Sequence, residues 1–319
     1  MTLFSQKKIK PKWAAFFSAI LAVALIIPIL HPLRSAAQQS PAIQFVSPAW
    51  LAEHTSDPKV HVLDVRINPL EYIGGHIPGA VHIADNTFRG PNGRLPIQYW
   101  ELDKLQSLFV KAGINSSDQV VVYSDGANIL GSTMTAYLLE RSGHAKVAVL
   151  DGGLKGYKDA GFSLTKEFPQ YADGNFTLKD DASIRVSLDE VRNLIGKSEI
   201  TFIDPRPPAL YAGEIDLFIR NGHIPGAKNI PWQSFTIGED NLHQLKSLDE
   251  IKAILAKRGI TPEDNIIVTC STGREATLQY VALKHLLGYP KVRIYEGSWT
   301  EYSSQPDLPI ATGQDPELV

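Results

Sequence analysis

Cysteine is almost absent from this sequence, because Cys270 is the only one among 319 residues. A single cysteine excludes every disulfide within the chain. A strong charge of either sign is also absent, since 31 lysines and arginines stand against 34 aspartates and glutamates. This balance gives no reason to expect a nucleic acid or an anionic membrane surface as a partner. The hydrophobic fraction of 44% is typical of a globular protein, and the length permits two domains.

Basic residues cluster in one place only, the extreme N-terminus. There, four lysines precede an apolar run over residues 13–30, which is followed by small residues up to Ala37. This order predicts a signal peptide over residues 1–37, cleaved after Ala37, although the length of the run also permits a retained membrane anchor. Either alternative predicts a periplasmic or otherwise exported protein that touches a membrane only through this leader. A lone cysteine in such a protein indicates pairing between molecules or a free reactive thiol.

The chain repeats itself. The pentapeptide "HIPGA" begins at His76 and again at His223, "DQVVVYSDG" is echoed by "DNIIVTCST", and "KVAVLDGG" is echoed by "KVRIYEGS". Collinear matches at a nearly constant offset indicate a duplication. We therefore expect an N-terminal domain over residues 38–165, a linker over 166–183 and a C-terminal domain over 184–319. Because the "HIPGA" histidines occur in both copies, we interpret them as part of a turn.

Each copy alternates short apolar runs with helical stretches. Runs such as "VVVYS" and "IIVTC" are continuously apolar up to their last residues, which predicts buried parallel strands. The later helix of each copy is expected to end at a glycine, Gly143 or Gly288, since glycine favours the position after a helix. The expected fold class is therefore α/β, with two tandem domains that each contain a mainly parallel sheet flanked by helices.

Cys270 stands at the end of a predicted strand and aligns with Ser124 of the first copy. The loop after it reads "STGREA" and comprises Ser271, Thr272, Gly273, Arg274, Glu275 and Ala276. Unpaired N–H groups at the following helix start, together with the freedom of Gly273, favour an anion there. Arg274 adds a positive charge, whereas Glu275 would oppose it if it pointed inward. We expect a lowered pKa and a nucleophilic thiolate at Cys270; the alternative is a cysteine that only packs at a strand end.

These motifs resemble the tandem-domain rhodaneses, which are sulfurtransferases, over about residues 44–305. The resemblance rests on "GHIPGA" in both halves, "VVVYSDG", "VLDGGLKGY" and "CSTGREA". It implies an inactive N-terminal domain, an active C-terminal domain and a catalytic Cys270 that faces the cleft between them. It also implies a small-molecule sulfur donor, a thiophilic acceptor such as cyanide or a thiol, a Cys270 persulfide intermediate, and no metal or organic cofactor.

Two other classes of function remain to be weighed. A rhodanese-like phosphatase would need an arginine six places after the cysteine, where this chain has Ala276. A non-catalytic rhodanese-like binding module is the stronger rival. Because two fused copies already form a pseudo-dimer, we expect a monomer.

The residues after Cys270 match neither of the two donor subgroups of the family. Thiosulfate-type relatives carry basic residues directly after the cysteine, and mercaptopyruvate-type relatives carry Gly-Ser there together with a histidine from the first domain. This chain has Ser271 and Thr272, and it lacks that histidine. We expect thiosulfate or a similar anionic donor, with 3-mercaptopyruvate as the alternative, because an anion needs positive charge around it. The candidate donor-binding residues are Arg220, Arg206, Asp85 and Arg94; Arg206 could instead pair with Asp204.

Overall fold

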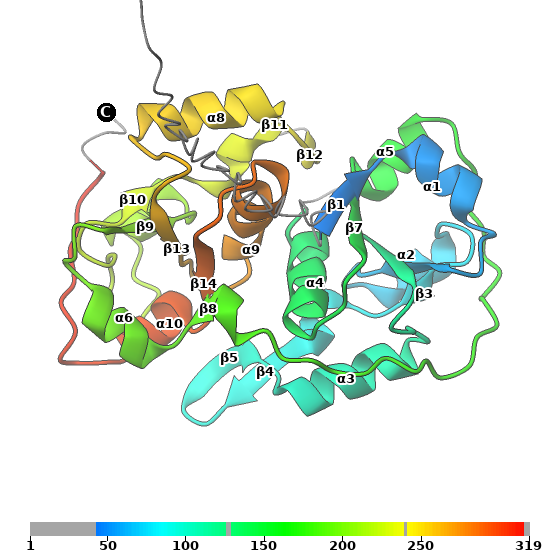
Figure 1. Cartoon of the computed structure of the whole chain (residues 1–319), viewed down its shortest axis with the longest axis horizontal. Helices are drawn as coiled ribbons and strands as arrows, with labels where there is room; N and C mark the ends of the chain where they lie inside the picture. Colours follow the sequence, from blue (N-terminus) through cyan, green and yellow to red (C-terminus); the bar gives the residue numbers. More distant parts are fainter. Residues whose placement is uncertain (1–42, 126–128, 239–240, 316–319) are drawn as a thin grey trace, which may run out of the picture. The chain divides into compact units, whose positions relative to one another are not determined.

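Two five-stranded sheets with the same strand order organise the part of the chain that the computed structural model describes, residues 43–125, 129–238 and 241–315 (Figure 1). The predicted leader, residues 1–37 with the apolar run 13–30, lies outside these residues. Within the described ranges no helix combines the length and the apolar character that crossing a bilayer requires. We call residues 43–165 the first half and residues 182–315 the second half.

All neighbouring strands in both sheets run parallel, as the apolar runs predicted. The first sheet has the order β1-β7-β6-β2-β3 and the second the order β8-β14-β13-β9-β10, so the strands of the two halves correspond in order. The strands of the first sheet are β1 (Ile43–Val46), β2 (Val60–Asp64), β3 (Val81–His82), β6 (Gln119–Tyr123) and β7 (Val147–Leu150). Those of the second are β8 (Arg185–Val186), β9 (Ile200–Asp204), β10 (Lys228–Asn229), β13 (Asn265–Val268) and β14 (Val292–Tyr295).

Each half also carries an antiparallel hairpin outside its main sheet. The hairpin of the first half is formed by β4 (Arg89–Asn92) and β5 (Leu95–Tyr99), and that of the second by β11 (Thr236–Gly238) and β12 (Asn241–Leu245). In the first hairpin Asn92 pairs with Leu95 across a two-residue turn, and Gly93 in that turn has a φ of +57°. Glycine at the first of the two turn positions favours such a tight turn, because it accepts a positive φ at no steric cost.

Helices cover the sheets in the same sequence in both halves. Those of the first half are α1 (Pro48–His54), α2 (Pro69–Gly74), η1 (Asp85–Phe88), α3 (Leu102–Lys111), α4 (Leu130–Arg141) and α5 (Gly153–Asp159). Those of the second are η2 (Ala182–Ile184), α6 (Leu188–Leu194), α7 (Pro208–Ala212), η3 (Trp232–Phe235), α8 (Leu248–Lys257), α9 (Ala276–Tyr280), η4 (Val281–Leu286) and α10 (Ser298–Ser303). The elements η1 to η3 are short 3-10 helices, whereas η4 is a π-helix that continues α9.

Local sequence explains where several helices begin and end. Ser187 and Ser247 each accept a hydrogen bond from the glutamate three residues later and close a capping box, which satisfies N–H groups at the start of α6 and α8. Gly143 and Gly288 follow α4 and η4 with φ values of +89° and +73°, so both helices end where the sequence predicted. Between the halves, residues 166–181 form no helix or strand.

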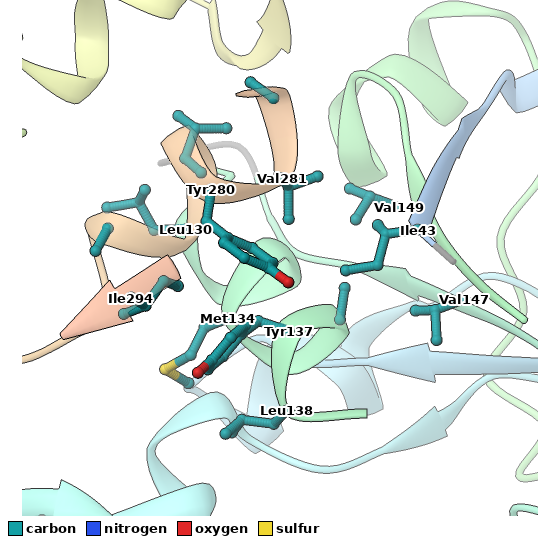
Figure 2. Close-up of a cluster of buried hydrophobic side chains, with 14 of the residues drawn as sticks. Ile43, Leu130, Met134, Tyr137, Leu138, Val147, Val149, Tyr280, Val281 and Ile294 are labelled. Carbon is teal, nitrogen blue, oxygen red and sulfur yellow. The ribbon is translucent and has the colours of Figure 1, made fainter. Parts of the chain in front are cut away.

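The copy-related helices α4 and α9 pack against each other at the junction of the two halves. All twelve residues of α4 are buried. Thr133 of α4 and Thr277 of α9 share a hydrogen bond of 2.9 Å. One hydrophobic cluster unites Met134 and Tyr137 of the first half with Tyr280 of the second (Figure 2). The two halves are therefore joined by a common core, which fixes the first half against the elements that carry Cys270.

Candidate active site

Cys270 lies just beyond the end of β13, as the sequence predicted, and its side chain is fully buried. The N–H of Gly273 donates a hydrogen bond to its Sγ at 3.1 Å, so the loop curls back over the sulfur. Gly273 has a φ of +86°, and a Cβ there would lie 2.8 Å from the carbonyl oxygen of Glu296. Only glycine fits this position, because an L side chain would be strained by both the backbone angle and the contact.

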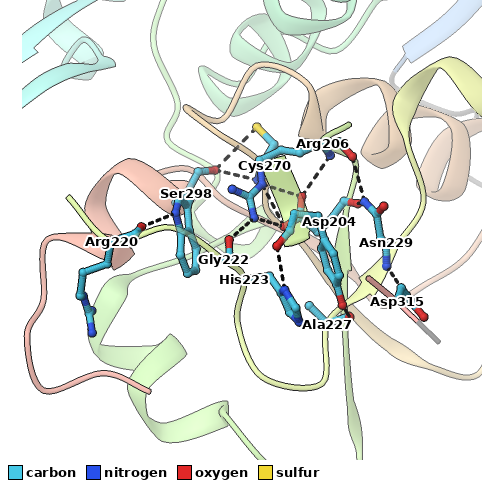
Figure 3. A network of polar contacts seen from close by, with 12 residues as sticks. Asp204, Arg206, Arg220, Gly222, His223, Ala227, Asn229, Cys270, Ser298 and Asp315 are labelled. Atoms are coloured by element: carbon cyan, nitrogen blue, oxygen red, sulfur yellow. Dashed lines mark hydrogen bonds and ion pairs between the residues drawn. The ribbon is translucent and has the colours of Figure 1, made fainter. Parts of the chain in front are cut away.

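The start of α10 supports the cysteine from the other side. The N–H of Cys270 donates to Ser298 Oγ at 3.1 Å, and that oxygen lies 3.8 Å from Cys270 Sγ (Figure 3). Ser298 has a φ of +50°, and it is the only non-glycine with a positive φ among the described residues. Backbone strain of this kind gathers at functional sites, because the surrounding structure must hold it in place. The sequence reasoning did not find Ser298.

The loop itself is fixed to α10 through its carbonyls. The N–H of Trp299 donates to the carbonyl of Cys270 at 2.9 Å. The carbonyl of Ser271 accepts two hydrogen bonds from Thr300, one from its N–H at 3.1 Å and one from its hydroxyl at 2.7 Å. With these oxygens turned toward α10, the loop is free to turn its N–H groups toward the sulfur, which favours a negative charge there.

The expected direction of the Cys270 pKa is wrong for this state of the protein. Burial raises the pKa of the thiol well above its ordinary value, and the carboxylate of Glu275 raises it further. The backbone N–H groups of Ala276 and Thr272 act in the opposite direction but do not compensate. Glu275 therefore points inward and opposes the thiolate, the case that the sequence left open. The free enzyme holds a thiol, and a thiolate forms only at the cost of removing a proton from a buried group.

Arg274 does not stand beside the sulfur as a free cation. It forms an ion pair with Asp85 of η1, with Nη2 to Oδ2 at 2.6 Å, and Asp85 is almost completely buried. Asp85 thus faces the active loop from the first half, but its partner is Arg274 rather than a substrate group. This pair ties the loop to the first half.

Two residues of the first hairpin that sequence reasoning missed also touch the active loop. Arg89 Nη1 donates to Thr272 Oγ1 at 3.1 Å. The ring of buried Tyr99 packs against Gly273, where the position of a Cβ would lie 3.2 Å from its Cε2 and from its hydroxyl oxygen. The signal that could have found the hairpin is Gly93, because glycine favours a tight turn with strands on both sides. The register shift between Gly90 and Asn92, which sets Arg89 opposite Tyr99, leaves no such signal in the sequence.

The other arginine candidates take structural roles. Arg206 is fully buried in an ion pair with Asp204 at 2.6 Å and also donates to the carbonyl of Gly222 at 2.8 Å (Figure 3). This corrects the donor-binding prediction for Arg206 in favour of its alternative, because no part of the guanidinium is exposed to a donor. Arg66 forms the same pair with Asp64 in the first half, also at 2.6 Å.

The donor-binding prediction for Arg220 is corrected in the same way, because this side chain also has a structural role. Its guanidinium donates to four backbone carbonyls, those of Tyr302, Ser303, Gln305 and Leu308. Figure 3 shows this side chain pointing away from Cys270. Arg220 therefore holds the chain that follows α10, and carbonyl oxygens already occupy its donors.

Arg94 is exposed at the turn of the first hairpin. It lines a cavity of about 770 Å³ between that hairpin and residues 217–219 and 300–306 of the second half. Thr300, which binds the loop carbonyl of Ser271, forms part of the same wall, but Cys270 itself does not line the cavity. Arg94 thus faces a space between the halves without reaching the sulfur.

The "HIPGA" histidines serve the turns, as the sequence indicated. His76 and His223 stack on Tyr72 and Tyr211 with ring centroids 3.9 and 3.6 Å apart. Each imidazole Nδ1 hydrogen-bonds the carbonyl of the tyrosine beneath it. In the described part of the chain, no three His, Cys, Asp or Glu side chains are grouped so that they could hold a metal ion.

The comparisons with known proteins agree with this geometry. The model of the rhodanese-like domain matches residues 47–160 and again residues 187–305, so the chain belongs to the rhodanese family and contains two copies of its domain. A protein of Synechococcus elongatus, provisionally named a thiosulfate sulfurtransferase, is 57% identical over 94% of this chain and 95% of its own length. The sulfur carrier protein TtuD of Thermus thermophilus is 36% identical, over 85% of this chain and 97% of its own.

A solved structure shows the same tandem arrangement. The crystal structure of SseA from Escherichia coli, described as a 3-mercaptopyruvate sulfotransferase with the rhodanese fold, matches with a TM-score of 0.73. It is 30% identical and is covered completely, while the match spans 81% of this chain.

Proposed function

We propose that this protein is a sulfurtransferase that carries a sulfane sulfur on Cys270 as a persulfide. The observation that carries the proposal is the Gly273 N–H directed at Cys270 Sγ at 3.1 Å, in a loop that only glycine allows to curl. Such fixed N–H donors stabilise the anions that form during the reaction without having to reorganise. The names of the two sulfur-handling relatives above support the same chemistry.

The reaction proceeds in two displacements. After the Cys270 thiol loses its proton, the thiolate attacks the outer sulfur of a donor such as thiosulfate. A new S–S bond forms, the S–S bond of the donor breaks, and its electron pair leaves with sulfite. A thiophilic acceptor, cyanide or a thiolate, then attacks the outer sulfur of the persulfide, and the Cys270 thiolate is the leaving group.

We propose an anionic sulfane donor of the thiosulfate kind. The support is the positive charge that Arg89 brings to the active loop, where its Nη1 binds Thr272 Oγ1. The same contact leaves Thr272 paired with an arginine instead of the histidine that the mercaptopyruvate subgroup would supply. 3-Mercaptopyruvate remains the second candidate, because the E. coli structure described for that donor shares the whole fold.

The order of residues in the leader supports a protein that acts outside the cytoplasm, and the fused halves support a monomer. Cell fractionation of the full chain, followed by sedimentation of the purified protein, tests both. A cytoplasmic or a dimeric protein would contradict them.

The decisive experiment is to incubate the full chain with thiosulfate and to measure its intact mass. We expect an increase by the mass of one sulfur atom on Cys270, and we expect cyanide to remove it as thiocyanate. The Cys270→Ser variant should form no adduct, whereas Ser124→Ala, at the corresponding position of the first half, should form it as the wild type does. If no sulfane donor ever gives an adduct, the protein is a non-catalytic member of its family.

A further inference from the structure

A pair of side chains on the first hairpin faces the active loop with hydrogen-bond donors to spare. Arg89 of β4 and Tyr99 of β5 are direct partners in the antiparallel register. Residues opposite each other in such a pair project from the same face of the hairpin. Both then meet the loop two to three residues after Cys270, Arg89 at Thr272 and Tyr99 at Gly273.

The spare donors are buried. Arg89 Nε and the Tyr99 hydroxyl have no exposed surface and no hydrogen-bond partner among the residues that the structure describes. Within the same described ranges, no carboxylate lies at ion-pair distance from Arg89. Buried polar groups are nearly always satisfied, because leaving one unpaired costs folding free energy. Two such groups side by side therefore indicate a missing partner.

Two other charged groups near the loop, Arg274 and Glu296, already have partners. Arg274 pairs with Asp85. Glu296 accepts a hydrogen bond from Tyr137 at 2.6 Å and pairs with Arg141. The positive charge of Arg89, unlike that of Arg274, thus faces Thr272 without a carboxylate in an ion pair with it among the described residues.

Tyr99 remains a donor throughout the pH range in which the protein would work. Burial raises the pKa of its phenol well above the ordinary value, and the neighbouring Cys270 raises it further. The hydroxyl therefore keeps its proton.

Building on the proposed sulfur transfer, we propose that Arg89 and Tyr99 bind the oxyanion of the sulfur donor. A guanidinium and a neutral hydroxyl offer charge and directed donors to the oxygens of one anionic group. The sulfonate end of thiosulfate and the carboxylate of 3-mercaptopyruvate share this chemistry. With its oxygens held by the first half, the donor presents its sulfur to Cys270 of the second, and the sulfite that leaves carries its new electron pair beside Arg89.

The binding test uses the Cys270→Ser background, in which no sulfur can be transferred. Calorimetric titration with thiosulfate should give a dissociation constant that rises about 10- to 100-fold on adding Arg89→Gln, as expected for the loss of a charge-assisted hydrogen bond. Adding Tyr99→Phe should raise it about 3- to 10-fold, as for a neutral bond. Arg94→Gln, on the same hairpin but exposed at its turn, is the matched control and should leave it unchanged.

The kinetic test uses variants with Cys270 intact. Arg89→Gln should raise the KM for the donor far more than it lowers kcat, and Arg89→Lys should restore part of the loss because it keeps the charge. Alkylation of Cys270 by neutral iodoacetamide should proceed at the wild-type rate, which separates donor binding from a misplaced loop. The donor whose KM rises more in Arg89→Gln, thiosulfate or 3-mercaptopyruvate, is the one whose oxyanion this site binds.

The outcomes separate this proposal from the proposed function. If wild type forms the persulfide but Arg89→Gln and Tyr99→Phe keep the wild-type KM for both donors, the oxyanion site is wrong while the sulfur transfer stands. Slower alkylation together with an unchanged dissociation constant would likewise overturn it, because the arginine would then only position the loop. If wild type forms no persulfide with any donor, the proposed function itself fails.

Discussion

The two halves of the chain end their central strands in the same way, yet they hold different atoms there. In the first half the carbonyl of Ser124 accepts the N–H of Leu154 at 3.0 Å, and in the second the carbonyl of Cys270 accepts the N–H of Trp299 at 2.9 Å. Ser124 Oγ is bound by the hydroxyl of Ser132 at 2.9 Å, whereas Cys270 Sγ is bound by a backbone N–H of its own loop. The backbone scaffold is therefore shared by both copies, whereas the thiol is present in one.

A second difference follows from the residue that supports each strand end. Gly153 and Ser298 correspond in the two copies and have φ values of +56° and +50°. In the first half a glycine adopts this left-handed angle. In the second half a serine adopts it, and the serine hydroxyl accepts a hydrogen bond from the Cys270 N–H. The second half thus bears backbone strain at the position where a hydroxyl serves the sulfur.

The first half, although it lacks a thiol, supplies what the active loop needs from outside. Asp85, Arg89 and Tyr99 all come from its residues 85–99 and all contact the loop. The comparison teaches that residues of this copy form one wall of the site that holds Cys270. Four changes, ordered by expected effect, test how far the two halves have diverged.

The largest effect is expected from Gly273→Ala. The added methyl group would meet the Glu296 carbonyl at 2.8 Å, on top of the strained φ of +86°, so the loop must move away from the sulfur. We expect the rate of persulfide formation to fall about 100-fold, as misplacement of a reacting group by about 1 Å does. Gly226→Ala is the control, since φ is +80° there but the Cβ meets nothing within 4 Å. Equal losses in both variants would contradict the contact argument.

Asp85→Asn should have the next largest effect, because it breaks the ion pair that joins the first half to the active loop. We expect the free energy of unfolding to fall by about 1.5–3 kcal/mol and the rate of persulfide formation by about 10-fold. A double-mutant cycle with Arg274→Gln should show a coupling of about 1 kcal/mol or more.

The control for that change is Asp64→Asn, which breaks the buried pair with Arg66 inside the first half. It should lower stability at least as much, yet leave the activity of the folded protein intact. A wild-type rate of persulfide formation in Asp85→Asn would mean that the ion pair stabilises the fold without influencing the reaction.

Ser298 offers a smaller and sharper test, because two variants separate its strain from its hydrogen bond. Ser298→Gly relieves the left-handed angle, worth about 1 kcal/mol, but loses a hydrogen bond of about the same value, so Tm should hardly change. Ser298→Ala keeps the strain and loses the bond, so its Tm should fall. Both should slow persulfide formation about 5-fold, since both release the Cys270 N–H. If Ser298→Gly reacted at the wild-type rate, the hydroxyl would have no role at the sulfur.

The smallest effect is expected from Glu275→Gln. Burial and the Glu275 carboxylate both raise the pKa of Cys270, so removing the charge should lower that pKa and speed persulfide formation at neutral pH by about 2- to 5-fold. In wild type the rate of persulfide formation should rise with pH as the thiolate forms. Ultraviolet titration measures the thiolate fraction at each pH, for comparison with the kinetics. A slower reaction at neutral pH would show instead that Glu275 receives the thiol proton.

The same raised pKa predicts how stability depends on pH. The folded protein keeps the Cys270 proton at pH values where the unfolded chain, with a thiol pKa of about 8.5, releases it. Stability from this group is therefore present below about pH 8.5 and is lost as the pH rises above it. Urea unfolding at a series of pH values should show that the free energy of unfolding falls less steeply above about pH 8.5 in Glu275→Gln than in wild type.

The sequence alone predicted the parts of the structure that depend on local pattern. The duplication, the parallel strands, the glycines after α4 and η4 and the position of Cys270 all follow from periodicity and from residue type. These features are set by neighbours within a few residues, so a single chain is enough to reveal them.

What escaped prediction depends on contacts between distant residues. The sequence left open whether Arg206 binds a donor or pairs with Asp204, and the structure decides for the pair. Arg89 and Tyr99 lie about 180 residues before the loop they touch. The direction of the Cys270 pKa was wrong for the same reason, because burial and the inward turn of Glu275 are properties of the fold.

Helix α4 carries a consequence for the history of the duplicated gene. Its Glu140 is buried at the junction, where it accepts a hydrogen bond from Tyr280 at 3.0 Å and lies at the same distance from His285, both in the second half. A first half produced by itself would expose the apolar faces of this helix and leave that carboxylate without either partner. Because the two copies share this helix, removing either should destabilise the other, so a gene that had lost the first half would encode a less stable second half.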